Sequence, residues 1–405
     1  MASLVKPKIF NKLPAYMAAI SRTGLLRCRF TMMNPNLLSS KRTLLSDAYH
    51  ADDIWINRER IVVDMDEMKI NLDRSFYDLK EPVMSVELHK YIDNVYDKEE
   101  LDVSEGYLYC YRHSPVAHHL RPSTVHSWLR LCIELDYPKD ALKVLQNKRD
   151  YGLFPENYTY NLLLDTFLRA NDIKGACDVA MVMMKEETLD NCPLSQLLSL
   201  YACHKYLNIG DIPEDEQWDI GMTIADASRG VGGSLSLSYH AIGCAMTGDV
   251  NKATRCLQNV AETDGPKIAQ EALDRIAAIL QQREDENTEL LGLFETTTKT
   301  LSNQGKVTAD TLDSLLESEV SDRLPDLERK DTGEYTSILE TWHAEHMEAL
   351  EKKRIAELEA EREAKEKRLD ELLRATGGIT YWAEKIEEAK QRKAAAEGKA
   401  EIEHR

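Results

Sequence analysis

The sequence predicts an all-α protein, an α-solenoid of helix–turn–helix repeats followed by a long charged helix. Three observations support this fold class. Apolar and small residues recur every 35 residues through 88–192, glycine (18) and proline (12) are sparse in 405 residues, and residues 344–374 are dense in Glu, Lys and Arg. Few turn-forming residues favour long helices over a β-sandwich or barrel. A period of this length is typical of stacked helical hairpins.

The first 43 residues have the composition of a mitochondrial transit peptide. Residues 1–42 contain eight basic side chains and no Asp or Glu. A basic, acid-free, amphipathic leader is typical of import into the mitochondrial matrix, and we expect cleavage just after Arg42. A basic tail that binds nucleic acid is the alternative. The residues that share an apolar face in a helix are Leu13, Met17, Ile20 and Leu25.

Removal of this leader would make the protein more acidic. The whole chain has a net charge of −19, and loss of the eight basic side chains leaves −27. A strongly acidic protein does not coat phosphate backbones nonspecifically. Any contact with RNA must therefore be local. Residues 44–87 are expected to form an N-terminal extension before the repeats.

The repeat region is expected to cover 88–282. Windows 88–122, 123–157 and 158–192 are each 35 residues long, and a later copy is shifted by 77 residues, which implies an insertion around 210–216. The alignment places Gly106 where the next unit has Ala141. The equivalent residues of the units are Val125 and Tyr160, Leu129 and Leu164, Asp136 and Asn171, Ala141 and Ala176, and, in the later copy, Gly248 to Ala253 against Asn171 to Ala176.

Each unit carries the signals of two helices joined by a turn. Ser123 is expected to cap a first helix, and Pro138 suits the first turn of a second helix because no N–H is needed there. Gly152 suits a left-handed C-cap. Ala141 and Ala176 allow the two helices to approach closely. One hairpin cannot bury both of its apolar stripes, so the units should stack; an irregular helical bundle is the alternative.

These units resemble pentatricopeptide repeats. They share an early aromatic residue, a central small residue and a terminal Gly-x-x-Pro, and the string YGLFPENYTYNLLLD at 151–165 is similar to a junction between two such repeats. Residues 44–205 also resemble the protein twenty-seven family of the mitochondrial ribosome's small subunit. The strings that carry this resemblance are LLSDAY (44–49), YLYCYRHSP (107–115), TVHSWLRLC (124–132) and QLLSLY (196–201).

The resemblance implies a pentatricopeptide-type α-solenoid that serves as a structural subunit of the small mitoribosomal particle. Its partners would be small-subunit rRNA and other mitochondrial small-subunit ribosomal proteins. In pentatricopeptide proteins that read sequence, a polar residue early in the first helix and another at the end of the unit select a base. Asn161 matches the early position and Asn191 the later one. His126 and Glu156 depart from the usual pairs, so base-by-base reading is not expected.

A basic window at 112–149 is the candidate RNA-binding surface. It has a net charge of +4. Guanidinium groups make bidentate contacts with phosphate, and nearby aromatic or histidine rings stack on splayed bases. A solvated helix face whose charges pair with acids elsewhere is the alternative. The predicted RNA-binding residues are Arg112, Arg121, Arg130, Lys139, Lys143, Lys148 and Arg149, together with Asn161.

The C-terminal part is expected to comprise an acidic helical linker at 283–335 and a long charged helix with its tail at 336–405. Apolar residues at heptad spacing mark one face of this helix, but Arg362 and Lys365 occupy the seam positions between them. A long helix laced with salt bridges is therefore favoured over a strong coiled coil. It would dock a neighbour or merely be solvated. The apolar seam residues are Ile355, Leu358, Leu369 and Leu372.

The sequence carries no signature of an enzyme, and we expect neither a catalytic site nor a metal, cofactor or small-molecule substrate. Residues 230–234 are glycine-rich but lack the lysine of a phosphate-binding loop. None of the eight cysteines forms a CxxC pair, so reduced, packed thiols are favoured over zinc ligands. No stretch approaches the ~18 apolar residues that a membrane span requires.

Three functions remain open on the sequence. The first is a structural protein of the small mitoribosomal subunit that contacts rRNA and neighbouring proteins. The second is a pentatricopeptide RNA-binding factor for translation or processing that acts off the ribosome. The third is a protein-only α-solenoid adaptor, with which the acidic charge is consistent.

Overall fold

The computed structural model describes residues 44–210, 212–263, 265, 267–281, 288–375 and 378–403. The expected transit peptide at 1–43 lies outside the described residues. Residues 45–405 form one compact unit. It is all-α apart from two short strands, which confirms the predicted fold class.

Two short helical segments precede the repeats. The 3-10 turn η2 (Asp47–His50) leads into α2 (Asp52–Ile56), and α3 (Met65–Asp73) continues into the π-helical turn η3 (Arg74–Leu79). Asp64 caps α3, because its side chain accepts hydrogen bonds from the backbone N–H groups of Asp66 and Glu67.

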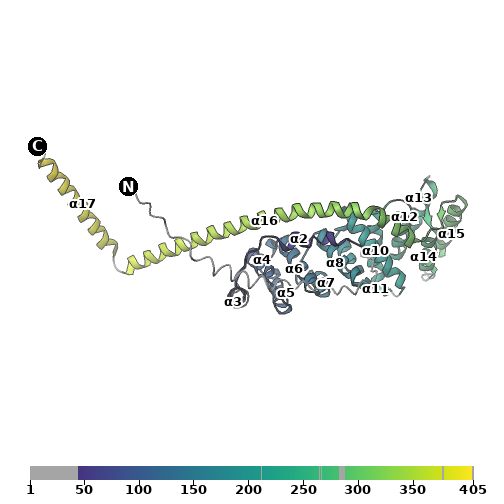
Figure 1. Ribbon diagram of the computed structural model, residues 1–405, viewed down its shortest axis with the longest axis horizontal. Coiled ribbons are helices and arrows are strands. Elements are labelled where there is room, and N and C mark those ends of the chain that lie inside the picture. The colour runs from purple at the N-terminus through teal and green to yellow at the C-terminus, as the bar shows by residue number, and fades with distance from the viewer. Residues whose placement is uncertain are drawn as a thin grey trace, which may run out of the picture. The chain divides into compact units, whose positions relative to one another are not determined.

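Helical hairpins then follow one another along the chain (Figure 1). Neighbouring hairpins pack on each other, and the first helices α4, α6, α8 and α10 are in contact in this order, as are α12 and α14. The pairs are α4 (Ser85–Asp93) with α5 (Lys98–Arg112), α6 (Pro122–Glu134) with α7 (Pro138–Gln146), α8 (Asn157–Arg169) with α9 (Ile173–Lys185), α10 (Pro193–Ile209) with α11 (Glu214–Ala227), α12 (Gly233–Met246) with α13 (Val250–Glu262), and α14 (Gln270–Gln281) with α15 (Thr288–Asn303). The short turns η4 (Ala117–His119), η5 (Leu189–Asn191) and η6 (Ser228–Gly230) lie between helices.

The turns inside the hairpins confirm the alignment of the repeats. Asp136, Asn171 and Gly248 are aligned positions, and all three have a positive φ, at 66°, 59° and 84°. Each ends the first helix of its hairpin and reverses the chain. Asp136 and Asn171 carry a side chain in a conformation that asparagine and aspartate tolerate better than most residues.

Two expected features of the repeats prove wrong. Ser123 does not cap α6: the helix starts one residue earlier at Pro122, whose ring fixes the φ angle of the first turn, and Arg121 is the N-cap residue. Gly106 is not equivalent to Ala141. Ala141 is the fourth residue of α7, whereas the fourth residue of α5 is Leu101, which is buried. The first hairpin is therefore out of register with the 35-residue period.

The helices of each hairpin approach closely at the small residues of the repeat. Ala141, Ala176 and Ala253 are buried at the same position of α7, α9 and α13. The insertion expected around 210–216 largely lengthens a helix, since α10 has 17 residues whereas α8 has 13. The extra turn ends at Gly210, which has the left-handed φ of 82° typical of a C-cap.

A two-stranded parallel pairing links the last hairpin to the long helix. Strand β1 (Ile268–Ala269) pairs with β2 (Val307–Thr308), with Ile268 opposite Val307. The long helix α16 (Leu312–Ala375) follows directly, and α17 (Gly378–Glu403) is the last helix. The boundary expected at 336 falls inside α16, which already begins at Leu312.

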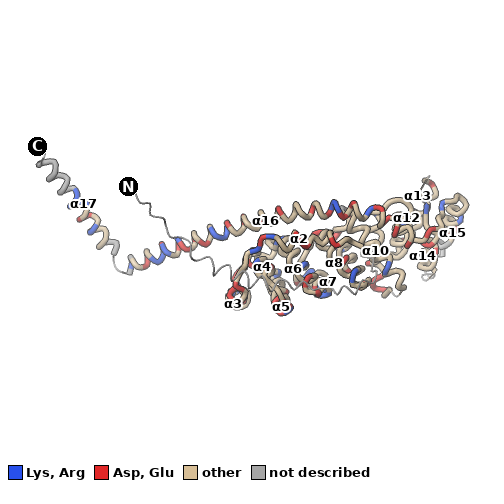
Figure 2. Tube along the Cα trace, viewed as in Figure 1, with Lys and Arg blue, Asp and Glu red and all other residues tan. Residues whose placement is uncertain are grey.

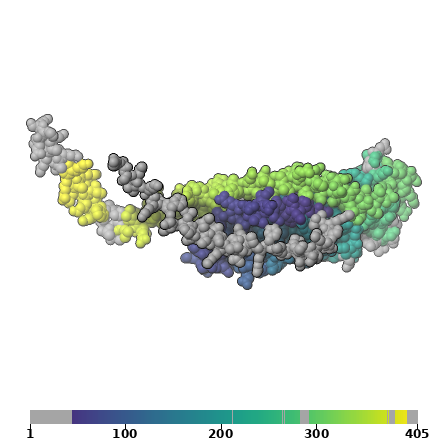
Figure 3. Space-filling model, in the orientation of Figure 1, coloured from purple at the N-terminus to yellow at the C-terminus, as the bar shows by residue number. Residues whose placement is uncertain are grey.

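The helix α16 packs along the first helices of the repeats, while α5, α7 and α11 lie on the opposite side (Figure 1). Tyr335 and Trp342 of α16 are buried there. In Figure 3 the light-green surface of α16 lies beside the purple surface of the segment that begins at residue 45. Among the described residues, no helix has the length and apolar character that crossing a bilayer requires.

Candidate functional site

Asn161, at the expected base-selecting position, is fully buried. Its side-chain amide donates to the hydroxyl of Tyr49 over 3.2 Å and to the carboxylate of Asp331 over 3.4 Å. Its carbonyl oxygen accepts from the hydroxyl of Ser195 over 2.8 Å. All of its hydrogen-bonding groups are therefore engaged inside the chain. The side chain of Asn191, its proposed partner, lies outside the described residues.

Arg130 is also buried, with 3% of its surface exposed. Its guanidinium donates to the carboxylate of Asp52 over 2.6 Å and to the backbone carbonyl of His50, and it lies 5.2 Å from the ring centre of Trp55. Because all three partners belong to the segment before the repeats, Arg130 fastens that segment to α6.

Two other predicted RNA-binding residues are bound to the chain itself. Arg121 donates to the backbone carbonyl of Glu345 on α16 over 3.0 Å. Lys148 is half-buried, pairs with Glu186 and donates to the carbonyl of Leu153 over 2.5 Å. Burial lowers the pKa of Lys148 despite the neighbouring carboxylate.

The remaining four basic residues, Arg112, Lys139, Lys143 and Arg149, are exposed at the end of α5, on α7 and just after α7. Lys139 pairs with Asp172 over 3.0 Å. A Cβ on Gly152 would lie 2.7 Å from the Nε atom of Arg112, so the Arg112 side chain lies across this turn. Three of the eight predicted residues, Arg112, Lys143 and Arg149, are thus exposed and form no ion pair with another described residue.

The second helices carry a ladder of ion pairs that sequence reasoning missed. Each step joins a lysine of one hairpin to an acidic residue of the next. A lysine in a second helix, with a carboxylate about one repeat later, is the signal that could have revealed it. The pairs are Lys98 with Asp140, Lys139 with Asp172 at 3.0 Å, Lys174 with Glu216 at 2.7 Å and Lys185 with Asp219 at 2.6 Å.

The surface formed by the first helices is covered by α16. The Tyr335 ring stacks on Tyr158 of α8, with 3.7 Å between ring centres and 7° between ring planes. The Tyr335 hydroxyl lies 2.9 Å from Nε2 of His126, whose Nδ1 lies 2.7 Å from the hydroxyl of Thr159. Burial lowers the pKa of His126 well below its usual value, so this imidazole is neutral.

Ion pairs fix α16 at both ends of this contact. At its start, the Asp313 carboxylate binds Lys205 at 2.6 Å and His204 at 3.0 Å on α10. Some forty residues on, Lys353 binds Glu87 of α4 at 2.5 Å. The helix therefore spans the first helices from α10 to α4 and occupies the side on which Asn161 and His126 lie.

The segment before the repeats is inserted between α16 and the repeats. The Tyr49 ring stacks on Tyr158 at 4.9 Å between ring centres, and its hydroxyl donates to Asp331 of α16. Burial raises the pKa of Asp331 above the usual range. Ser46 donates from its backbone N–H to Glu328 over 2.9 Å. Residues 45–56 and α16 thus together cover the surface formed by the first helices, which we call the groove.

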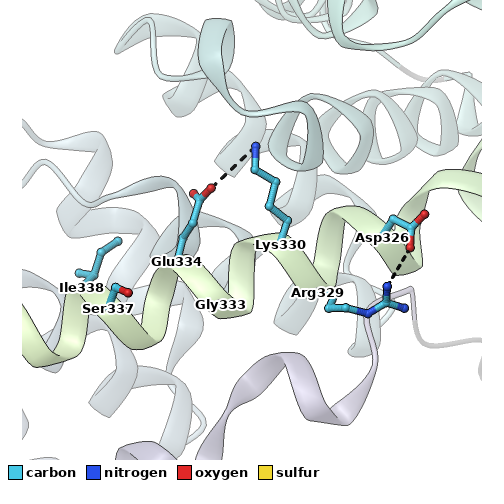
Figure 4. Close-up of a pocket in the computed structure, with 7 residues that line it drawn as sticks. All are labelled: Asp326, Arg329, Lys330, Gly333, Glu334, Ser337 and Ile338. Carbon is cyan, nitrogen blue, oxygen red and sulfur yellow. Dashed lines mark hydrogen bonds and ion pairs between the residues drawn. The ribbon is translucent and has the colours of Figure 1, made fainter.

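The face of α16 that points away from the repeats carries a shallow hollow, which is lined by residues of α16 alone (Figure 4). It lies at Gly333, where an added Cβ would meet no atom within 4 Å. Two ion pairs along the helix flank it, Arg329 with Asp326 at 3.1 Å and Lys330 with Glu334 at 3.7 Å. The hollow reflects the missing side chain of the glycine.

Two of the described cysteines lie next to each other in the core. The Sγ atoms of Cys177 and Cys203 lie 3.7 Å apart in the core, and this contact together with burial raises the pKa of Cys177. His204, next to Cys203 in sequence, binds Asp313 instead. Within the described part of the chain, no group of three or more His, Cys, Asp or Glu side chains is arranged to hold a metal ion.

Comparison with known families gives a match. The family model described as mitochondrial 28S ribosomal protein S27 matches residues 16–371. The chain belongs to this family. It is therefore a protein of the small subunit of the mitochondrial ribosome, and the match includes the repeats and most of α16. Proteins of ribosomal families are in general structural, and membership implies ribosomal partners and a mitochondrial location.

Proposed function

We propose that the chain is a structural component of the small mitoribosomal subunit that contacts rRNA through exposed basic side chains at the end of α5, on α7 and just after α7, and that binds neighbouring ribosomal proteins. The observation that carries the proposal is the family match over residues 16–371. The contact with rRNA rests on the arrangement of basic side chains. The proposed role is to hold rRNA and neighbouring proteins in position, and this role requires no catalytic step.

Because α16 and residues 45–56 cover the first helices, we expect the contact with rRNA on the outer side of the solenoid. A strand of RNA read by the first helices would have to displace Tyr335 from Tyr158 and Asp331 from Asn161. His126 would then lose the Tyr335 hydroxyl and Asn161 the Asp331 carboxylate, and a buried polar group that loses its hydrogen bond costs about 1–3 kcal/mol. This argues against the second candidate function, a factor that reads single-stranded RNA off the ribosome.

The exposed basic residues beside α7 support a phosphate contact. Within the described residues, no ion pair is recorded for Arg112, Lys143 or Arg149, whereas Lys139 and Lys148 are engaged in pairs between hairpins. Arg112 and Arg149 present guanidinium groups that bind phosphate oxygens bidentately. Because the chain has a net charge of −19, we propose a local contact rather than an extended RNA track.

The test is sedimentation of mitochondrial lysate on sucrose gradients with and without RNase. We expect the chain to sediment with small subunits. Slow, RNase-sensitive complexes would support the off-ribosome factor, and small RNase-indifferent complexes would support a protein-only adaptor. Either result would overturn the proposal.

A charge-reversal variant tests the surface itself. We expect Arg112→Glu/Lys143→Glu/Arg149→Glu to weaken binding of purified chain to small-subunit rRNA. Loss of three phosphate contacts should also reduce the slope of log K against log salt by roughly 2 to 3. The matched control, Lys330→Glu/Lys352→Glu/Lys367→Glu, changes the charge equally on exposed positions of α16. Equal losses in both variants would refute the proposed surface.

The proposed location is the mitochondrial matrix, where the small subunit is expected to act. The composition of residues 1–42, with eight basic and no acidic side chains, supports matrix import. Import into isolated mitochondria followed by N-terminal sequencing of the product tests this. We expect a new N-terminus close to Thr43, and an unprocessed chain outside the inner membrane would contradict it.

A further inference from the structure

One aromatic side chain of α5 lies at the surface, although its neighbours in the sequence are buried. Tyr107, Leu108 and Tyr111 are at most 1% exposed. The Tyr109 ring is 44% exposed. This helix belongs to the side of the repeats that lies opposite α16 (Figure 1). Tyrosine is frequent in binding surfaces, because its ring contributes apolar area while its hydroxyl can stay hydrated.

Tyr109 belongs to a group of three aromatic rings. The ring centre of His113, one helical turn later, lies 4.3 Å from that of Tyr109, with 35° between the ring planes. The ring centre of Tyr151, in the loop after α7, lies 6.1 Å from that of Tyr109, with 72° between the ring planes. Nδ1 of His113 donates to the backbone carbonyl of Tyr109 over 2.8 Å. The Tyr151 hydroxyl donates to Glu105 over 2.6 Å, so hydrogen bonds hold both neighbours of the exposed ring.

The Arg112 guanidinium lies on the same face of α5. Residues three and four apart share one side of a helix, so Arg112 and His113 both accompany Tyr109. The Arg112 side chain crosses the turn at Gly152, where a Cβ would lie 2.7 Å from its Nε atom. Arg112 is exposed and forms no ion pair with another described residue. The end of α5 and the loop after α7 thus form one surface, in which a guanidinium group without an ion pair lies beside an aromatic ring.

A nucleotide whose base is unstacked has the two groups that fit this surface. The flat face of a base stacks on exposed tyrosine or histidine rings, and every base has such a face. A guanidinium group binds the oxygens of a phosphate bidentately. Tyr109 and Arg112 are three residues apart, which is about 4.5 Å along the helix axis. One nucleotide can therefore reach both side chains.

A double helix fits the surface less well than a single unpaired nucleotide. Glu105 and Asp150 lie at the edge of the ring group, and their charges offset those of Arg112 and Arg149. A duplex presents phosphates on two strands and keeps its bases inside. Both carboxylates would repel these phosphates, and the Tyr109 ring would have no base to stack on. An unpaired nucleotide instead brings one phosphate and one open base, so the balance of charges favours it.

A helix of a neighbouring protein does not match this face either. A docked helix requires a stripe of apolar side chains on the surface that receives it. Besides Tyr109, the exposed side chains on this face of α5 are those of Asp102, Arg112 and His113. A second copy bound by the same face around a twofold axis would set these polar groups against themselves. Tyr109 and His113 thus form a small stacking surface among charged groups, which suits a single base.

We propose that the rings of Tyr109 and His113 stack on an unpaired base of small-subunit rRNA while Arg112 binds an adjacent phosphate. This inference deepens the proposed function and rests on it, because it names an unpaired nucleotide as the part of rRNA that the end of α5 contacts. The base lies outside the groove, so Asn161 takes no part in holding it. Stacking distinguishes little between bases. The fold of the rRNA, rather than its local sequence, therefore selects the nucleotide.

Binding to two labelled RNA duplexes of equal length tests the preference for an unpaired base. One duplex is fully paired, and the other carries a single bulged adenosine. We expect the purified chain to bind the bulged duplex at least ~fivefold more tightly by fluorescence anisotropy, as the stacking of one base allows. Tyr109→Ala should abolish this difference without changing the salt dependence, whereas Tyr109→Phe should keep it. The control Tyr381→Ala removes another exposed tyrosine and should change neither affinity.

Two results of this test would overturn the inference: equal binding of both duplexes by the parent chain, and a Tyr109→Ala variant that keeps the preference. Tyr109 is exposed, so its variants should keep the unfolding midpoint of the parent chain. If the chain binds rRNA, loses this binding in Arg112→Glu/Lys143→Glu/Arg149→Glu and treats both duplexes alike, only the inference fails. If the chain binds no rRNA and is absent from small subunits, the proposed function fails with it.

Cross-linking in the particle identifies the nucleotide. An aromatic photo-crosslinking residue replaces Tyr109, and small subunits are purified after irradiation. We expect an adduct with an rRNA nucleotide that chemical probing of protein-free rRNA marks as unpaired. An adduct with a paired nucleotide, with another protein or with a second copy would overturn the inference, and so would the lack of an adduct in particles that contain the chain. The same residue in place of Tyr381 controls for nonspecific adducts.

Discussion

Replacement of Tyr335 tests whether α16 is held in the groove by the contacts described above. Tyr335 is 1% exposed, stacks on Tyr158 and bonds His126. Truncation to alanine removes a buried aromatic ring, for which core substitutions cost about 3–5 kcal/mol. The stacked pair adds about 0.5–1.5 kcal/mol, and an unpaired buried imidazole about 1–3 kcal/mol. Since these contributions overlap, we expect Tyr335→Ala to destabilise the docking of α16 by about 4 kcal/mol.

Hydrogen exchange is the appropriate assay, because it reports local opening of one element within a folded chain. A loss of about 4 kcal/mol corresponds to an almost thousandfold faster exchange, at roughly 1.4 kcal/mol per tenfold. We expect this acceleration in amides of α16 and of residues 45–56, which share the contact. Amides in α12 and α13 should change little.

Two variants serve as controls. Tyr335→Phe keeps the stacked ring but leaves His126 without its partner, so we expect a loss of about 1–2 kcal/mol. Tyr381→Ala removes the same side chain from an exposed site, since Tyr381 is 56% exposed, and should leave exchange in α16 unchanged. The reasoning is refuted if Tyr335→Ala accelerates exchange in α16 by less than tenfold, or if Tyr381→Ala does so equally.

Three further predictions concern the groove and the repeats. Gly152→Ala should destabilise the chain by at least ~1 kcal/mol, because φ is +60° and the new Cβ would meet Arg112 at 2.7 Å. Arg130→Ala should cost about 1–3 kcal/mol, because it removes hydrogen bonds of a buried group, and release residues 45–56 to exchange, whereas Lys143→Ala should change stability by less than ~0.5 kcal/mol. Burial lowers the pKa of His346 from 6.5 to about 4, so docking of α16 should be fully stable above pH 6.5 and weaken as the pH falls towards 4.

Urea unfolding checks the two substitutions, and exchange in α16 between pH 7 and 4.5 checks the third prediction after correction for intrinsic rates. The sign for His346 follows because the released helix binds more protons than the docked one between these two pKa values. His346→Gln should reduce this pH dependence, and we expect the remainder from His126 and His204, which contact α16 and whose pKa values burial also lowers. An Arg130→Ala variant that keeps its stability but binds rRNA less well would show that Arg130 contacts RNA rather than the N-terminal segment.

The repeats were predictable because their signals are local. A residue that tolerates a positive φ at the turn, a proline at the start of a helix and a buried alanine four residues into the second helix each act within a few residues of the chain. Such signals recur with the period, so aligned positions such as Asp136 and Asn171 behave alike. The first hairpin does not follow this alignment, because Leu101 occupies the position at which α7, α9 and α13 have an alanine.

The candidate RNA surface was only partly predictable, because charge alone does not reveal what a side chain contacts. Arg130 and Lys143 both belong to the same basic window, yet Arg130 binds Asp52, 78 residues earlier in the chain, and Lys143 is exposed. Lys139 and Lys148 join hairpins instead. Their partners are separated from them by about one repeat, so only the stacking of hairpins brings the charges together.

The sequence by itself determined the helical hairpins, their period, the long charged helix and the family, since each depends on residues close together in the chain. Only the tertiary structure decided that α16 returns over the repeats, with Asp331 reaching Asn161 across 170 positions of sequence. A helix with one apolar stripe can cover any complementary surface, and its sequence does not state which one. The surface that α16 covers is determined by the contact of Tyr335 with His126 together with the ion pairs of Asp313 and Lys353. These contacts can form only after the repeats have stacked.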